Sequence, residues 1–443
     1  MKKSMLPLLF LGLAFAVHAA DTNAPAWLSR PLSQADCMNI ALAQNAVVLK
    51  AKDDLEASQG VVVQTRAVAL PQLTANGQYK DQETTLMQNY FGSSQSQSWN
   101  AGLQLVQSIY AGGKLVAAFH GADATRKQAM ANYETTVADT LLLVRLAYYD
   151  VLLAGQQVIV NEASVKLLQK ELDDQNRRFD AGTVPHFNVL RAEVAVANAR
   201  PALIHARSQE RIAKNVLVNL LGYNLPREVL ENIPMVLTDN FDTASWDMPL
   251  PDAIQQSLAR RTELKALRQD IELQDVNVIN AKAGYKPTVQ LFAGYNWINN
   301  AFTTDLADDL NGWNAGAQVS WSLFDGALTV GKVKQAKALS AKSRTELQDR
   351  TRQIELDVRT AYSTFLEAKE VLDSQAKVQE QADEALREAN SRFDAGTGTQ
   401  LDVLDAETSL TQARTTQVTA QHDYAAARAR LERAIGAELA TVK

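Results

Sequence analysis

An internal repeat is the feature that most constrains this chain. Residues 178–183, Arg-Phe-Asp-Ala-Gly-Thr, recur without change as residues 392–397, an offset of 214 residues. Over residues 177–200 and 391–414, twelve of 24 positions are identical, more than a shared helical composition would give. Two related units of about 214 residues therefore make up most of the 443-residue chain, and each should fold into the same elements.

The repeat also locates a loop. Gly112 matches Gly326 at the offset of 214, whereas Pro71 matches Pro287 at an offset of 216. The net change of two residues falls between positions 71 and 112. Because changes of length are best tolerated in surface loops, we expect a loop in this interval.

The first twenty residues are typical of a secretory signal. Lys2 and Lys3 precede the apolar run 6–17, which ends in the small residues that signal peptidase favours. This run is too short to span a membrane as a helix. We predict that residues 1–20 are removed and that the mature protein lies outside the cytoplasm.

Composition and motifs argue against several classes of function. The formal net charge is −6, whereas a nucleic-acid partner would require a basic surface. Residues 326–332 have the spacing of a P-loop, but Val333 stands where Ser or Thr would hold magnesium. The histidines form no pair at metal-binding spacing, and no G-x-S-x-G nucleophile motif occurs. We expect no nucleic acid, no metal, no cofactor and no enzymatic activity.

Each unit has the same predicted order of elements. A first helix is expected over 39–68 and again over 251–284, and a proline then ends it and opens a strand. The predicted strands are 71–80, 98–110, 287–298 and 312–324.

The predicted strands alternate between apolar and polar residues. In the clearest, Trp313, Val319 and Trp321 would share one face and Asn314 and Gln318 the other. Each run is about ten residues long, which is what a tilted strand needs to cross a bilayer. Aromatic residues near the strand ends would form the interfacial girdle of a membrane barrel. The predicted girdle residues are Tyr79, Trp99, Tyr295, Trp297, Trp313 and Trp321. A soluble sandwich with one solvated face is the alternative that the pattern leaves open.

A long proline-free helix is predicted after each strand pair, over 115–179 and 328–393. About 65 residues span roughly 100 Å, and a helix of this length needs partners because isolated propensity cannot hold it. A turn then leads into a returning helix, over 186–221 or 399–435. The returning helix and the first helix of each unit together match the long helix in length, so we expect them to stack end to end beside it.

Four strands cannot close a membrane barrel, since the smallest use about eight. Open strand edges are not tolerated in lipid, so copies of the chain must share a barrel. Two copies would give eight strands and three would give twelve, and the strand count does not choose between them.

Two other non-enzymatic functions each leave part of the sequence unexplained. A periplasmic coiled-coil scaffold that never enters a membrane would leave the four alternating segments unexplained. A diffusion porin would leave the long helices unexplained. Membrane fractionation distinguishes the scaffold, which would be soluble, from a membrane protein.

The repeated tip motif, followed by Leu-Asp-Val-Leu-Asp-Ala-Glu at 401–407, resembles the outer-membrane efflux protein family of TolC-like outer-membrane factors. The resemblance covers about residues 30–437. It implies an α+β membrane protein in which a homotrimer forms a 12-stranded β-barrel continued by an α-helical coiled-coil periplasmic barrel. A first repeat at 30–222 and a second at 249–437 would flank an equatorial linker at 223–248.

The resemblance also implies a function. The family forms the exit duct of tripartite efflux pumps and type I secretion systems, with an iris-like periplasmic entrance. The implied partners are a periplasmic adaptor protein, an inner-membrane transporter of the RND, ABC or MFS type, and outer-membrane lipid. The sequence does not indicate whether the cargo is a drug, a metal or a protein.

By resemblance, Asp402 and Asp405 would narrow the periplasmic entrance. Residues three apart share a helix face, and threefold symmetry would place six carboxylates around one axis. Thr399 precedes Asp402 at the spacing of a capping box, so helix capping is an alternative role for Asp402. Glu407 is expected on the outer wall.

The chain departs from the family's type member at the lock of the entrance. Gly398 and Asn188 stand where that protein has an arginine and an aspartate, so this ion pair cannot form. Phe393 replaces a tyrosine, which removes a hydroxyl contact. We expect closure by helix packing with different latches.

By resemblance, the hairpin tips would also meet the adaptor. The expected contact residues are Arg178, Gly182, Thr183, Arg392, Gly396 and Thr397. The alternative is turn chemistry, since glycine supplies a positive φ between antiparallel helices. Asp180 and Asp394 are expected to serve the turns.

Overall fold

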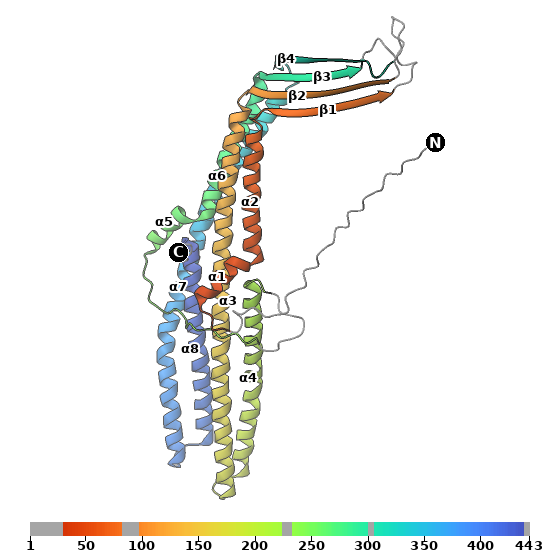
Figure 1. The fold of residues 1–443 in the computed structure, drawn as a ribbon. Coiled ribbons are helices and arrows are strands. Elements are labelled where there is room, and N and C mark those ends of the chain that lie inside the picture. Colours follow the sequence, from red (N-terminus) through yellow and green to blue (C-terminus); the bar gives the residue numbers. More distant parts are fainter. Residues whose placement is uncertain (1–29, 82–96, 224–232, 300–304, 438–443) are drawn as a thin grey trace, which may run out of the picture.

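The structure, a computed structural model, describes residues 30–81, 97–223, 233–299 and 305–437. Within these ranges the molecule is a long helical bundle, with a four-stranded sheet at one end and the tips of two helical hairpins at the other (Figure 1). No helix in the described ranges combines the length and apolarity needed to cross a membrane. The predicted signal peptide, residues 1–20, lies outside the described residues.

Both repeats contribute to one sheet. Its strands are β1 (Gln72–Asp81), β2 (Gln97–Ala111), β3 (Thr288–Asn299) and β4 (Asp309–Ser320). They lie in the order β1-β2-β3-β4, and every neighbouring pair is antiparallel. Because β2 pairs with β3, the repeats share a continuous sheet whose edges are β1 and β4, and they are not separate domains.

The first three strands begin and end within one residue of the predicted bounds, but the prediction for the fourth, 312–324, is wrong at both ends. Ser320 pairs with Thr288, the first residue of β3, so residues 321–324 have no strand beside them. Trp321 therefore lies just beyond β4, where its indole N–H donates to the carbonyl of Tyr285 at 3.1 Å. At its other end β4 starts earlier than predicted, at Asp309, which pairs with Asn299.

Two long helices form the axis of the bundle. α3 (Lys114–Asp180) and α7 (Leu328–Asp394) have 67 residues each, which corresponds to about 100 Å. Shorter helices stack end to end beside them: α2 (Ala46–Ala67), α4 (His186–Leu220), α6 (Thr262–Lys282) and α8 (Gln400–Ile435). α6 and α8 contact α3 as well as α7, so the repeats also share one bundle.

The predictions of single helices over 39–68 and 251–284 are wrong. One residue with an extended ψ, 125° at Asn45 and 121° at Arg261, interrupts each of them. The helices before the two breaks are α1 (Gln34–Gln44) and α5 (Leu250–Arg260), and α6 passes into a short 3-10 turn at Ala283–Tyr285.

The breaks exist because the end of a returning helix packs into each of them. Gly222 follows α4 with φ +84°, and Gly436 caps α8 with φ +79°. A Cβ on Gly222 would lie 2.4 Å from the carbonyl oxygen of Gln44, so the backbones touch at the break. A continuous helix would leave no room for this contact.

Asn45 holds the first joint with a single amide. Its Oδ1 accepts hydrogen bonds from the backbone N–H groups of Val47 and Val48, at 2.8 and 3.4 Å, and thereby caps α2. Its Nδ2 donates to the carbonyl of Leu220 at 2.7 Å. One buried side chain therefore supplies hydrogen-bond partners to backbone groups at the start of α2 and at the end of α4.

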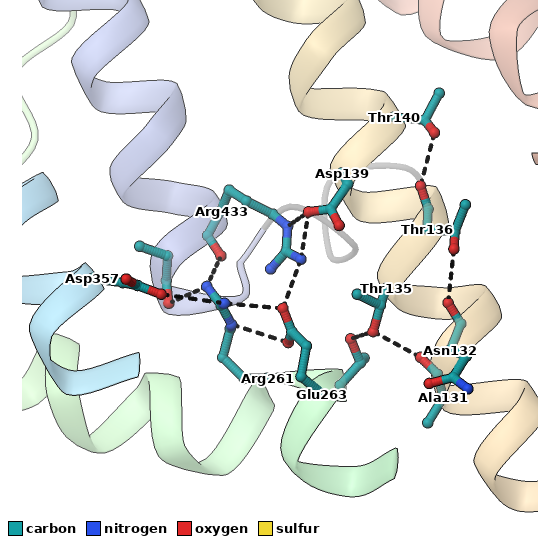
Figure 2. Close-up of polar contacts among 12 residues, drawn as sticks. Ala131, Asn132, Thr135, Thr136, Asp139, Thr140, Arg261, Glu263, Asp357 and Arg433 are labelled. Atoms are coloured by element: carbon teal, nitrogen blue, oxygen red, sulfur yellow. Dashed lines mark hydrogen bonds and ion pairs between the residues drawn. The ribbon is translucent and has the colours of Figure 1, made fainter. Parts of the chain in front are cut away.

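Arg261 holds the second joint through ion pairs and a backbone hydrogen bond (Figure 2). Its guanidinium pairs with Glu263 at 2.9 Å and donates to the carbonyl of Ala434 at 3.4 Å. Glu263 also accepts from Arg433 at 2.9 Å, and Arg433 reaches Asp139 of α3 at 2.6 Å. The second joint is thus tied to the long helix of the first repeat.

The described part of the predicted linker, residues 233–248, lies across the middle of the bundle. Leu237 forms a bridge with Leu32, and Phe241 packs at the edge of the core that contains Tyr148 and Tyr149. Trp246 packs edge-on against Phe365 of α7, with ring centroids 5.5 Å apart. This segment covers the hydrophobic clusters of both repeats.

Candidate functional site

The tips of the two hairpins, α3–α4 and α7–α8, have the same backbone. Gly182 and Gly396 have φ values of +74° and +72°. The N–H groups of Thr183 and Thr397 each donate at 2.9 Å to the carbonyl of the arginine five residues earlier, Arg178 or Arg392. The threonine hydroxyls donate to the same carbonyls, at 2.8 and 3.2 Å. Turn geometry therefore accounts for the repeated motif.

The side chains at the two tips differ. Arg178 of the first hairpin pairs with Asp394 of the second at 2.7 Å, and its guanidinium lies 4.8 Å from the ring centroid of Phe393. Its repeat equivalent, Arg392, instead approaches Glu388 of its own helix at 3.9 Å. Asp394, which was expected to serve its turn, thus also links the two hairpins.

A second contact joins the tips at the lock positions. Gln400 of α8 donates from Nε2 to the backbone carbonyl of Asn188 in α4, at 3.1 Å. Gly398 is confined by its turn: a Cβ there would lie 3.1 Å from the Cβ of Arg392 and the backbone N of Phe393. A larger residue at 398 would require this turn to shift, which is a physical reason for the missing arginine.

Asp402 caps α8. Its Oδ2 accepts from the backbone N–H of Thr399 at 2.8 Å and from the Thr399 hydroxyl at 2.9 Å, and the backbone N–H of Asp402 donates back to that hydroxyl. These hydrogen bonds hold the pKa of Asp402 below its ordinary value. Asp405 lies one turn further along α8 and is exposed. Within one chain, then, Asp402 has a structural role, whereas Asp405 has none of its own.

The expectation that Glu407 lies on the outer wall is wrong. Its side chain is 5% exposed, packed where α8 meets α3, and its Oε2 has no hydrogen-bond partner. Burial, together with the charge of Glu171 on α3, raises the pKa of Glu407 to about 7. Its repeat equivalent, Glu193 of α4, is exposed. The sequence carries no signal for this difference, because both glutamates lie in the same motif.

The predicted girdle residues fall into two groups at opposite ends of the sheet. Tyr79 lies directly opposite Trp99, and Tyr295 directly opposite Trp313, near the ends of the strands that are far from the helices. Trp297 packs on Tyr295, with ring centroids 4.6 Å apart. Trp321 lies at the helical end, eight residues along the chain from Trp313. At about 3.4 Å per residue this separation is roughly 27 Å, close to the height of an apolar membrane band.

Within the described residues, no cluster of His, Cys, Asp or Glu could hold a metal ion. Some of the ion pairs found there lie within one helix, as between Arg392 and Glu388, and others join two helices, as at the second joint. As a whole, the helices form a long wall, and polar contacts between its segments lie at the tips and joints.

Comparisons with known proteins agree with this fold. The family model described as outer membrane efflux protein matches residues 37–223 and 253–437. The chain is 25% identical to the outer membrane protein TolC of Vibrio cholerae over 410 residues, which cover 91% of this chain and 90% of that protein. It is 24% identical to the cobalt-zinc-cadmium resistance protein CzcC of Cupriavidus metallidurans, with 94% of each chain covered.

A solved structure shares the fold. The CmeC outer membrane channel of Campylobacter jejuni superposes with a TM-score of 0.78 at 16% identity, covering 91% of this chain and 86% of that one. The two stretches matched by the family model correspond to the two repeats. The chain is therefore an outer-membrane protein that belongs to the outer membrane efflux protein family.

Proposed function

We propose that three copies of this chain form the exit duct of a tripartite efflux pump or type I secretion system. The duct would carry substrates from an inner-membrane transporter, through a periplasmic adaptor, across the periplasm and outer membrane. The observation that carries the proposal is the sheet, which is too small to close and has two open edges.

The strands support a shared barrel. All ten residues of β1 are exposed, on both faces of the strand, and so are all but one of β4. An open four-stranded sheet with aromatic bands needs neighbours on both edges when it lies in lipid. Three copies would supply twelve strands, joined β4 to β1 around a ring.

The helices support the same assembly. Exposed apolar residues lie on one face of α4 and on one face of α7, as in a helix that packs against a partner. Those on α4 are Phe187, Leu190, Val194, Ile204, Ile212 and Val216. Those on α7 beyond residue 350 are Leu356, Leu366, Val371 and Val378. α4 and α7 stand at opposite sides of the bundle in Figure 1, where a second and a third copy would cover them.

Chemical cross-linking tests the assembly. The variant with both Ala75→Cys on β1 and Ala317→Cys on β4 should give, with a short bismaleimide, a ladder that ends at three chains. Each single variant is the control and should stay uncross-linked, because a head-to-tail ring places β1 of one chain beside β4 of the next and never puts two β1 or two β4 strands side by side. Cross-linking of a single variant, or a monomer by native mass spectrometry in detergent, would contradict the trimer.

At the entrance, the proposal assigns Asp402 and Asp405 to a ring of carboxylates facing the axis. The contacts of Arg178 with Asp394 and of Gln400 with the Asn188 carbonyl would help to hold that entrance closed. The two tips, around Gly182 and Gly396, would meet the adaptor. Cysteines at these tip glycines should cross-link to the cognate adaptor, and the transporter recovered with it would identify the pump class.

Single-channel recording tests the ring. Asp402→Asn with Asp405→Asn removes both charges while keeping a capping acceptor at 402, and we expect lower cation selectivity. The matched control changes the equivalent positions of the first tip, Asn188→Ser with Arg191→Gln. Unchanged selectivity in the Asp402–Asp405 variant would exclude these residues from the entrance.

A further inference from the structure

The line of contact between α3 and α8 joins the two hairpins below the joints, and its chemistry changes along its length. Near the joints, Asp139 pairs with Arg433 at 2.6 Å and Arg145 pairs with Glu432 at 2.5 Å. We call these two pairs the equatorial seam. Arginine stays protonated over the neutral pH range, and each of these pairs joins a guanidinium of one hairpin to a carboxylate of the other.

Towards the tips, the contacts depend on the protonation state of the side chains that make them. His422 of α8 lies between two carboxylates: Nε2 is 2.9 Å from Asp150 of α3, and Nδ1 is 2.9 Å from Asp423. Both nitrogens can donate only when the imidazole is protonated. The neutral ring satisfies one carboxylate and leaves the other facing a lone pair.

Further down, Ser164 meets Thr411 at 3.2 Å, and Glu407 is buried beside them. Glu407 borders a groove between α3, α4 and α8 of about 390 Å³, whose other lining residues, among them Asn161, Asn198 and Gln412, carry no charge. Buried, unpartnered amide oxygens of Gln175 and Gln400 lie closer to the tips. This stretch from Asp150–His422 to Glu407 is called the tip-side seam below.

We propose that the α3–α8 contact is a pH-sensitive joint in which protonation of His422 and Glu407 closes the tip-side seam while the equatorial seam stays fixed. In acid, the imidazolium binds both carboxylates and the buried Glu407 carries no charge. At higher pH, the neutral His422 imidazole can donate to only one of the two carboxylates. Glu407 then becomes an unpaired buried anion near Glu171. Both changes favour separation of the hairpins at the tips.

The charged neighbours of these groups agree with this direction. Glu171 is the charged side chain of α3 that acts on Glu407, and it disfavours the carboxylate. On α7, Asp383 forms an ion pair with Arg414 of α8, and Arg387 forms one with Glu384 of its own helix.

Around His422, Phe241 packs edge-on against the ring at 6.2 Å. The adjacent Asp242 is paired with Arg428 and lies 4.0 Å from Arg145. The two carboxylates at 2.9 Å are therefore the groups that set the charge of this histidine.

The pH window follows from the two groups. Burial alone would lower the pKa of His422, but Asp150 and Asp423 raise it above its ordinary value of 6.5. Its stabilising contribution is complete below 6.5 and is lost as the pH rises through the raised pKa. For Glu407 the pKa rises from 4.5 to about 7. The loss of stability caused by its buried charge therefore grows between these pH values and is constant above them. The seam should therefore loosen as the pH rises from 4.5 through about 7.

Amide hydrogen exchange on the full chain in detergent tests the inference. Between pH 5 and pH 8, after correction for intrinsic exchange, protection of residues 161–175 and 402–413 should fall at least tenfold. Protection around 139–145 and 428–433 should stay unchanged. Equal loosening of both parts, or no loosening of the tip-side seam, would overturn the inference.

Variants separate the two groups. Glu407→Gln mimics the protonated acid, so the lower part of the tip-side seam should stay protected at pH 8. His422→Gln should remove the response around residue 150. Glu193→Gln, the exposed repeat equivalent, should behave like the unmodified chain. If Glu407→Gln retains the whole response, Glu407 is not part of the switch.

Glu171→Gln gives a second test of the electrostatics, because loss of that charge should shift the midpoint of the Glu407 transition to lower pH. An unmoved midpoint would count against the assigned electrostatics. Control of the entrance by this seam rests on the proposed function, but the exchange measurement does not. A channel that fails to conduct while the seam responds to pH would overturn only the proposed function.

Discussion

The two joints, at Asn45 and Arg261, solve one packing problem with different chemistry. They are repeat equivalents at the offset of 216, and the carbonyls they bind, those of Leu220 and Ala434, are equivalents at 214. The first joint uses one uncharged amide. The second uses a network that extends through Glu263 to Arg433.

The comparison separates what the fold requires from what it permits. Both joints keep an extended residue between two helices and a glycine with positive φ opposite it. The side chain that satisfies the freed backbone groups has changed from amide to guanidinium. The change also allowed the second joint to bind Asp139 of α3, so only this joint ties one repeat to the other through ions.

The largest expected effect comes from the glycine at the first joint, and its equivalent at the second joint should matter less. Gly222→Ala places a Cβ 2.4 Å from a backbone oxygen, so we expect a loss of about 3 kcal/mol or more from strain and overpacking together. Gly436→Ala meets its nearest atom at 3.1 Å, a side-chain carbon of Arg260, and should lose roughly 1–2 kcal/mol. The free energy of local opening, from amide exchange at each joint, measures both. Equal losses would mean that the two joints are packed equally tightly.

Removal of the polar groups should rank next. Arg433→Met leaves Asp139 without its cation and Glu263 with one fewer, and we expect a loss of about 3 kcal/mol at the second joint. Asn45→Ala removes a helix cap and leaves the Leu220 carbonyl unbonded, a loss of roughly 1–2 kcal/mol at the first.

Asn219→Ala is the matched control for Arg433, because Asn219 is its repeat equivalent and is exposed. This control should leave both joints unchanged. A larger effect for Asn45→Ala than for Arg433→Met would reverse the proposed ranking.

Acid should weaken only the second joint. Burial alone would raise the pKa of Glu263, but Arg433 and Arg261 outweigh it and hold the pKa below the ordinary value of 4.5. A lowered pKa gives stability that is present above 4.5 and is lost as the pH falls through the lowered value. Exchange between pH 6 and pH 3 should therefore increase at the start of α6. An equal increase at the start of α2, where Asn45 does not titrate, would contradict this assignment.

The smallest effect is expected at the tips. Arg178→Ala removes an exposed ion pair and a contact with Phe393, which together should contribute about 1 kcal/mol or less to holding the hairpins together. Arg392→Ala, the equivalent change, should leave the inter-hairpin contact unaffected. Exchange of residues 392–400 measures both variants, and the Arg178 effect should shrink in high salt. Insensitivity to salt would indicate that packing, and not charge, holds the tips.

Local pattern was sufficient for most of the regular elements. The period of two located three strands to within one residue, and the absence of proline defined α3 and α7. The breaks at Asn45 and Arg261 could not be found in this way, because asparagine and arginine occur within helices. Each break is set by a helix end that arrives from about 175 residues further along the chain.

The sequence by itself determined the repeat, and with it the paired strands, the long helices and the identical backbone of the two tips. These features depend on periodicity and turn residues, which act over a few positions. Only the tertiary structure decided which of two equivalent residues is buried, as with Glu407 and Glu193, or paired across hairpins, as with Arg178 and Arg392. The reason is that α8 packs against α3 while α4 presents an apolar face outward, so identical motifs enter different surroundings.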